Sequence, residues 1–342
     1  MTDAAAAPLA RPRGRRARVV IVTPALADAN NGNWHTARRW AAFLRAHCAV
    51  SLQREWDGKD ADAMIALHAR RSADSVARWV ARPGAADDGA ARRLAVVLTG
   101  TDLHRDIATD ASARRSLASA GTLVLLSGRG AERLPAAMRR KTCTILPSTP
   151  ARAALAPRAR TFDLALVGHL REEKDPMTAL RALARLDDAR LRLRHVGGAH
   201  ADPSGARLAQ AMREAAANDA RIELLGPQPH AVARREIRRA RLLLLPSRLE
   251  GGPTVAVEAV ASGTPLLASR IDGTVGLLGE DYPGYFPVGD DAALAALIAR
   301  CRDEADFLRR LRDACAARAP RFAPECERQS VRALARRLLR PR

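Results

Sequence analysis

The sequence predicts an α/β protein made of two doubly wound domains. Short apolar runs alternate with helical stretches, and the alternation occurs as two successive series. Continuous apolar runs of this kind are typical of parallel strands buried on both faces, and the helices between them indicate βαβ units. A segment rich in Pro, Ala and Arg, residues 147–160, separates the two series and is expected to be a linker. With 342 residues the chain is long enough for two domains that each have a core.

The first series predicts an amino-terminal Rossmann-like domain over residues 17–150. A helix is expected from about residue 35 to residue 46, after the first apolar run. The expected strands are residues 18–23, 63–67, 94–99, 123–126 and 142–146. Residues 1–16 are rich in Ala, Pro and Arg and lack the apolar stretch of a signal peptide, so we expect a disordered basic tail.

The second series predicts another Rossmann-like domain over residues 161–320. Its expected strands are residues 162–167, 191–196, 222–224, 242–245 and 265–268. From about residue 290 the apolar spacing becomes helical. In doubly wound domains ligands bind beyond the carboxyl ends of the strands, so two such domains are expected to face a common cleft.

Composition and charge argue against several classes of function. The formal net charge is +20, but 54 of the 57 basic residues are Arg and they are spread along the chain. Without a basic patch interleaved with aromatic residues, we expect no specific nucleic-acid site. No apolar run reaches the roughly 18 residues of a membrane span. The five cysteines have no C-x-x-C spacing, so we expect neither a zinc site nor disulfides, and a cytoplasmic location.

Residues 246–267 are the most informative segment of the chain. The apolar run 242–245 leads into a Gly-Gly turn and then a helix, for which Pro253 suits the first position. Backbone N–H groups at such a helix start are free to face an anion, which the helix dipole also favours. The groups expected to do so are those of Gly251, Gly252 and Thr254.

Two acidic residues flank this predicted phosphate site. Glu250 precedes the helix and Glu258 lies within it, which would suit bonds to sugar hydroxyls and to a ribose. The alternative is a strand–turn–helix with two solvated glutamates. The segment resembles the E-x7-E signature of GT-B glycosyltransferases of family 4, with Ala259, Gly263 and Pro265 in the following E-A-x-A-x-G-x-P run. The resemblance implies a GT-B fold, a nucleotide-sugar donor, and a last helix, residues 326–339 within 321–342, that returns to the first domain.

A second segment, residues 168–175, resembles the G-R-x-x-x-x-K-G stretch of the same family. The resemblance implies that Gly168 and Lys174 bind the donor and that Lys174 neutralises the leaving diphosphate, which makes Lys174 and Glu250 candidate catalytic residues. His169 stands where the family has Arg. Either His169 carries part of the positive charge, or Arg171 or Arg248 replaces it. The alternative for the whole segment is a solvated, charged helix start.

Polar residues also follow the predicted strands of the first domain. Family 4 enzymes carry a Gly-rich loop after the first strand, which corresponds here to Asn30-Asn31-Gly32-Asn33 and implies donor contacts for Gly32 and Asn33. Asn33 or Thr36 could instead cap the helix. His68 and Asp102 could assist proton movement, and helix capping or surface charge is the alternative for each. The candidate acceptor-binding residues are Asn33, His35, Arg38, Arg71, Thr101 and Asp102, and His68 is a candidate catalytic residue.

A narrower resemblance involves four segments, residues 22–25, 30–40, 98–103 and 168–176. They are similar to the selenosugar synthases of selenoneine biosynthesis. That similarity implies C–Se bond formation between a UDP-sugar, such as UDP-N-acetylglucosamine, and selenophosphate, with possible coupling to a selenophosphate synthetase.

Two other functions stay open from the sequence. One is an ordinary family 4 enzyme that acts on a lipid or polysaccharide hydroxyl, and the other is a non-catalytic binder of a sugar nucleotide or nucleic acid. No cofactor is expected, because the UDP-sugar is a substrate. No Asp-x-Asp pair follows a predicted strand, so we expect no metal site, with Lys174 and helix dipoles in the place of a cation.

Overall fold

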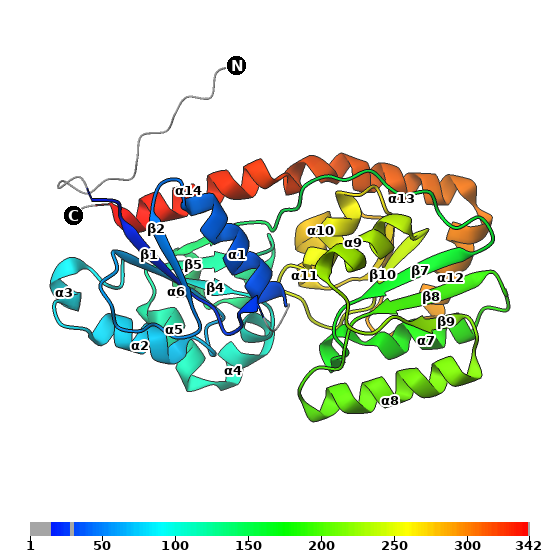
Figure 1. Cartoon of the computed structure of the whole chain (residues 1–342), viewed down its shortest axis with the longest axis horizontal. Helices are drawn as coiled ribbons and strands as arrows, with labels where there is room; N and C mark the ends of the chain where they lie inside the picture. Colours follow the sequence, from blue (N-terminus) through cyan, green and yellow to red (C-terminus); the bar gives the residue numbers. More distant parts are fainter. Residues whose placement is uncertain (1–14, 28–30, 341–342) are drawn as a thin grey trace, which may run out of the picture. The chain divides into compact units, whose positions relative to one another are not determined.

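The computed structural model describes residues 15–27 and 31–340 (Figure 1). The chain forms two compact units, residues 1–146 with 325–342, and residues 147–324. Most of the predicted tail lies outside the described residues. Its last two residues are described, and Arg15 pairs with Asp62 at 3.4 Å.

The first unit is built on a six-stranded parallel sheet with the order β2-β1-β3-β4-β5-β6. Its strands are β1 (Arg18–Val22), β2 (Ala49–Gln53), β3 (Ala63–Leu67), β4 (Leu94–Leu98), β5 (Thr122–Leu125) and β6 (Thr142–Thr144). Its helices are α1 (Gly32–Leu44), α2 (Ala73–Ala81), α3 (Ala85–Asp88), the π-helix η2 (Asp102–Asp106), α4 (Ile107–Thr109), α5 (Ala111–Ser119), the 3-10 helix η3 (Gly130–Arg133), α6 (Ala136–Arg139) and α14 (Pro324–Leu339).

Both faces of this sheet are buried, as the continuous apolar runs predict. Side chains alternate between the faces of a strand, so Val20 and Val22 join one core, with Trp79 of α2. Val19 and Ile21 join the other core, which includes side chains of α1 and α14.

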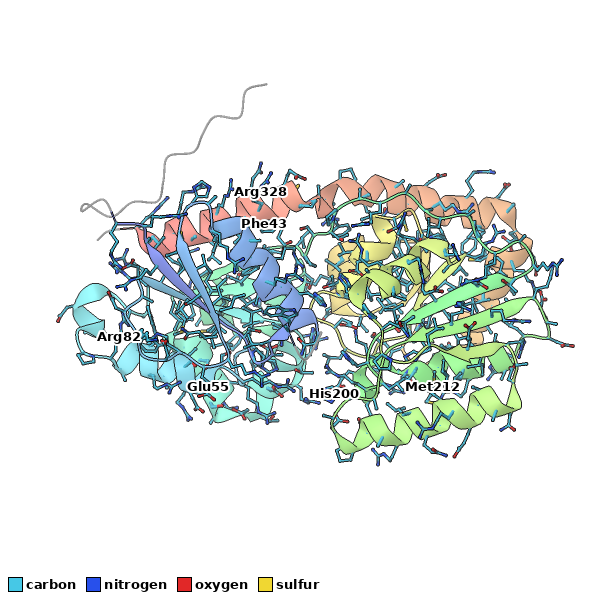
Figure 2. All side chains as sticks on the ribbon, in the orientation of Figure 1. Phe43, Glu55, Arg82, His200, Met212 and Arg328 are labelled. Carbon is cyan, nitrogen blue, oxygen red and sulfur yellow. The ribbon has the colours of Figure 1, made fainter. Side chains whose placement is uncertain are left out.

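α14 is attached to α1 by a buried polar contact as well as by apolar packing. The carboxylate of Glu327 accepts hydrogen bonds from Arg39 Nη2 at 2.9 Å and from Trp40 Nε1 at 2.7 Å. In Figure 2 the labelled side chains of Phe43 and Arg328 mark α1 and α14 at this place. The last helix of the chain is therefore part of the first unit's structure.

The second unit repeats the design with the strand order β12-β11-β10-β7-β8-β9, again six strands and all parallel. The strands are β7 (Phe162–Val167), β8 (Leu191–Val196), β9 (Ile222–Leu224), β10 (Leu242–Leu245), β11 (Leu266–Ser269) and β12 (Tyr285–Phe286). The helices are η4 (Glu172–Lys174), α7 (Pro176–Ala184), α8 (Pro203–Asn218), α9 (His230–Arg239), α10 (Thr254–Val260), α11 (Asp272–Leu278), α12 (Asp291–Asp303), α13 (Ala305–Arg318) and η5 (Ala319–Phe322).

The segment expected to be a linker, residues 147–160, is fastened to α9. Arg234 Nη2 donates to the carbonyl of Pro150 at 2.9 Å, and Arg238 Nε donates to the carbonyl of Ala153 at 2.8 Å. Leu155 N donates in turn to the carbonyl of Arg238. The arginines thus satisfy backbone carbonyls that an extended, Pro-rich segment cannot pair within itself.

None of the helices within residues 15–27 and 31–340 is long and apolar enough to cross a membrane.

Candidate functional site

The carboxyl ends of β7 and β10 bring two of the predicted residues into contact. Lys174 Nζ lies 2.5 Å from Glu250 Oε1, and Ser247 Oγ donates to the same oxygen at 2.9 Å. Both side chains are partly exposed, at 27% for Lys174 and 12% for Glu250. The pair is therefore a charged group at the edge of the sheet where ligands of doubly wound domains bind.

Two glycines shape the backbone beside Lys174. At Gly168 the φ of 154° is one that L side chains rarely adopt, although a Cβ atom there would be in ordinary contact with Lys174 Cε at 3.6 Å. A Cβ atom at Gly197 would stand only 1.9 Å from the Gly168 carbonyl oxygen. At the crossing of these two backbone segments, Gly197 is therefore required by the close approach and Gly168 by its φ.

Beside this crossing lies a small pocket whose lining includes Gly168, His169, Lys174, His195 and Ser247. His195 Nε2 is 3.1 Å from the Gly168 carbonyl oxygen. Burial lowers the pKa of His195 to about 4, so its neutral ring donates this hydrogen bond. The contact fixes the loop that carries Lys174.

The structure distinguishes among the three residues that could replace the family arginine. Burial, followed by the charges of neighbouring cations, lowers the pKa of His169, so this ring is neutral at pH 7 and does not supply a cation. Arg171 pairs with Glu173 at 3.3 Å. Arg248 pairs with the buried Asp175 at 2.9 Å and keeps 56% of its side chain exposed. Arg248 is the best placed of the three to reach a ligand.

The Gly-Gly turn presents backbone amides, as predicted. Among the described residues no acceptor is bonded to the amides of Gly251, Gly252 or Thr254. Pro253 is the N-cap of α10 rather than its first residue, which corrects the predicted helix start. This single-residue shift leaves the amide of Thr254 at the open end of the turn.

Glu258 is buried within α10, with 4% of the residue exposed. Its Oε1 atom lies 2.5 Å from Nε2 of His230, the first residue of α9. Sequence reasoning missed His230 and His195, because each reaches the site from a separate element and belongs to no motif, and it did not single out Ser247 within residues 246–267.

In the first unit, the loop before α1 is organised by a cap. The side chain of Asn31 accepts a hydrogen bond from Trp34 N at 3.1 Å, so neither Asn33 nor Thr36 is the cap, and the helix begins at Gly32 rather than at residue 35. Asn30 lies outside the described residues. His35 and Arg38 follow one turn apart on α1, and Arg38 is exposed and forms no ion pair with any described residue.

His68 directly follows β3 and adopts the left-handed region, with a φ of 74°, and only 2% of it is exposed. Its Nδ1 accepts a hydrogen bond from Arg71 N at 3.3 Å, and its Nε2 lies 3.0 Å from Thr101 Oγ1. Burial lowers the pKa of His68, so the ring is neutral with its proton on Nε2. The Nε2–H group of His68 donates to Thr101 Oγ1. The hydroxyl hydrogen of Thr101 can then be donated to another group.

Asp102 has a structural role that the sequence did not predict. It has no exposed surface, and its carboxylate accepts hydrogen bonds from the amides of Ala69, Thr99 and Gly100 at 2.8–2.9 Å. The expectation that it contacts an acceptor is wrong for this reason. Asp102 instead joins the loops after β3 and β4, and thereby holds His68 against Thr101.

The predicted residues therefore form two groups. Lys174, Glu250 and Glu258 with the Gly-Gly turn lie in the second unit, and the residues around α1 and the ends of β3 and β4 lie in the first. Arg71, like Arg38, is exposed and forms no ion pair in the described part of the chain. Within that same part, no three His, Cys, Asp or Glu side chains cluster in a way that could hold a metal ion.

The second unit matches a known protein family. Residues 148–320 match the family of glycosyl transferases group 1. The D-inositol 3-phosphate glycosyltransferase of Mycobacterium sp. (strain KMS) is 35% identical over 146 residues, which are 41% of this chain and 32% of that protein. That of Streptomyces coelicolor is 33% identical over 168 residues, 45% of this chain and 36% of that protein. The match thus spans about a third of these relatives' length.

Solved structures resemble the whole chain. Anabaena HepE in complex with UDP and glucose has a TM-score of 0.73 at 14% identity, covering 94% of this chain and 99% of HepE. The sucrose-phosphate synthase of Thermosynechococcus elongatus has a TM-score of 0.68 at 20% identity, covering 95% of this chain and 99% of that protein. These similarities and the two parallel sheets show the GT-B fold. Since the family match covers half of its residues, the chain belongs to the glycosyl transferases group 1.

Proposed function

We propose that the protein transfers a sugar from a UDP-sugar to selenophosphate. The observation that carries the donor half is the contact of Lys174 with Glu250 beside the open amides of the Gly-Gly turn. A diphosphate needs positive charge and N–H donors, and a sugar needs carboxylate acceptors for its hydroxyls. HepE, which shares the fold, has been solved with UDP and with UDP-glucose, which supports UDP as the nucleotide.

In this proposal the ligand-free ion pair opens when the donor binds. Lys174 turns from Glu250 to the diphosphate, and Glu250 accepts hydrogen bonds from the sugar. As the bond between the sugar C1 and the diphosphate oxygen breaks, its electron pair goes to UDP, and Lys174 stabilises the charge that develops there. Glu258 holds the ribose.

The acceptor half rests on the first unit and on the resemblance to selenosugar synthases. Arg38 and Arg71 are exposed cations without an ion pair in the described residues, and Thr101 has a hydroxyl hydrogen to donate. An anion such as selenophosphate suits these groups. Its selenium is already nucleophilic, so the transfer needs no strong base, and water can then cleave the P–Se bond to release the selenosugar. The buried, neutral His68 accordingly serves to orient Thr101.

A hydroxyl acceptor, here one that carries a phosphate, is the second candidate, and the known relatives support it better than they support selenophosphate. The relatives with 33–35% identity are named D-inositol 3-phosphate glycosyltransferases, and that acceptor is also an anion. Here the sugar would pass to a hydroxyl oxygen, and the arginines of the first unit would bind the phosphate. A base would then be needed for the hydroxyl proton.

The deciding experiment measures UDP release from UDP-N-acetylglucosamine or UDP-glucose. The acceptors are selenophosphate prepared beforehand and freed of metal, D-inositol 3-phosphate, orthophosphate and glycerol, each tested with EDTA and with Mg²⁺. We expect release with selenophosphate in EDTA and a selenium-containing sugar by mass spectrometry. Faster release with D-inositol 3-phosphate would establish the second candidate, and release that requires Mg²⁺ would refute the role given to Lys174.

A further inference from the structure

Glu258 is a carboxylate in a nearly closed environment. Its neighbours Val257 and Ala259 have no exposed surface, so α10 is packed into the second unit on both sides of it. A carboxylate that has left water needs hydrogen-bond partners within the protein. The position of those partners decides which of its oxygens is left for a ligand.

His230 is the partner that the structure provides. Its Nε2 atom lies 2.5 Å from Oε1 of Glu258, and 41% of its side chain is exposed. No hydrogen bond to Oε2 is made by the residues that the structure describes. Oε1 of Glu258 is therefore bonded to α9, and Oε2 is available to a ligand.

An arginine also lies near this carboxylate but is directed elsewhere. Arg234 follows His230 by one turn of α9, and its charge interacts with that of Glu258. Its Nη2 atom, however, donates to the carbonyl of Pro150. The directional contact with Glu258 thus belongs to His230.

We infer that His230 is a positioning residue for nucleoside recognition. By holding Oε1 of Glu258, it turns Oε2 toward the two hydroxyls of the ribose. This inference rests on the proposed function, in which Glu258 binds the ribose of UDP. A contact that only fastened α9 to α10 would affect stability and leave the recognition of ribose unchanged.

The test compares calorimetric binding of UDP and of 2′,3′-dideoxy-UDP, which lacks both hydroxyls. We expect His230→Ala to weaken UDP about tenfold, since charge-assisted hydrogen bonds have that strength, and to leave the dideoxy compound within about twofold. His230→Gln should restore most of the loss, because its amide nitrogen can donate to the same oxygen. His230→Asn, which is too short, should resemble His230→Ala. Arg235→Ala, an exposed position on the same helix, is the matched control.

Glu258→Gln separates this inference from the proposed function. If Glu258→Gln leaves UDP affinity unchanged, the ribose contact of the proposed function is wrong. If it weakens UDP while His230→Ala binds normally, or if His230→Ala weakens both nucleotides equally, only the role of His230 is overturned. The double variant should bind UDP no more weakly than Glu258→Gln alone, because both changes remove one contact. Thermal unfolding of each variant verifies that the second unit is folded.

Discussion

At the scale of single residues, Lys174 lies against Glu250 in the structure, and in the proposed function it turns to the diphosphate of the donor. Removing one preorganised charge from a leaving group costs several kcal/mol of barrier, so Lys174→Ala should lower kcat about 100-fold or more. Steady-state kinetics of UDP release measures this. Arg181→Ala, which removes a surface cation that pairs with Asp291, is the control and should keep normal turnover. A near-normal kcat for Lys174→Ala would contradict the assignment.

The same scale shows what spacing in the sequence can predict. Lys174 and Glu250 could be selected from two separate motifs, and the structure brings them into contact. Asp102 and His68 could not be interpreted correctly, because a polar residue after a strand has the same pattern whether it binds a ligand or fastens loops. Only the burial of Asp102 and its bonds to three amides distinguish the two.

At the scale of elements, Asp102 connects the loop after β3 to the loop after β4. Asp102→Ala would leave three backbone amides without their acceptor, so we expect a loss of about 3 kcal/mol or more in the stability of the first unit. Urea unfolding measures it. Asp110→Ala, which removes the partly exposed cap of α5, should cost only about 1 kcal/mol. Equal losses of stability in the two variants would contradict the role of Asp102 as the acceptor that joins the two loops.

His195 should make the second unit sensitive to acid. Its pKa is about 4 in the folded chain against an ordinary value of 6.5. Above pH 6.5 the His195 ring is neutral in both the folded and the unfolded chain. As the pH falls from 6.5 toward 4, the ring takes up a proton only in the unfolded chain. The expected loss of stability from this residue is about 2 kcal/mol at pH 5. His195→Gln keeps a donor for the Gly168 carbonyl and should lose less stability between pH 7.5 and pH 5. Parallel pH profiles for the two proteins would exclude this role.

The elements that the sequence missed share a physical cause. β2 is an edge strand whose five residues are partly or fully exposed, so it lacks the apolar run of a buried strand. β12 has only two residues, too few for any periodicity. α1 begins earlier than predicted because the cap is Asn31, and three Asn in one turn offer equivalent caps to sequence reasoning.

At the scale of the whole molecule, the two ends of the chain depend on each other. Glu327 of α14 accepts bonds from Arg39 and Trp40 of α1 and has no exposed side-chain surface. Glu327→Ala would leave the guanidinium of Arg39, whose side chain is 18% exposed, and the indole N–H of Trp40 without their acceptor, which we expect to cost about 3 kcal/mol. We expect amide hydrogen exchange to become faster in the first unit and to stay unchanged in the second. Mass spectrometry measures both rates. Glu325→Ala, exposed on the same helix, should exchange like the unaltered protein.

The division into two α/β units could be predicted, because two series of buried strands leave a repeated apolar signature. The participation of the last helix in the first unit came from the family resemblance, since nothing in the helix's own pattern indicates which sheet it covers. The hydrogen bonds that attach this helix to α1 join residues that are separated by 287 and 288 positions in the sequence. Local periodicity carries no information over that separation.

The crossing of Gly168 and Gly197 has an evolutionary consequence. A methyl group at position 197 would overlap the carbonyl oxygen of Gly168, so no other amino acid fits there without moving the backbone that supports Lys174. Every missense change at that codon is therefore expected to be removed by selection in organisms that need this enzyme. The two glycines should persist together across its descendants, even where the surrounding arginines drift with the base composition of the genome.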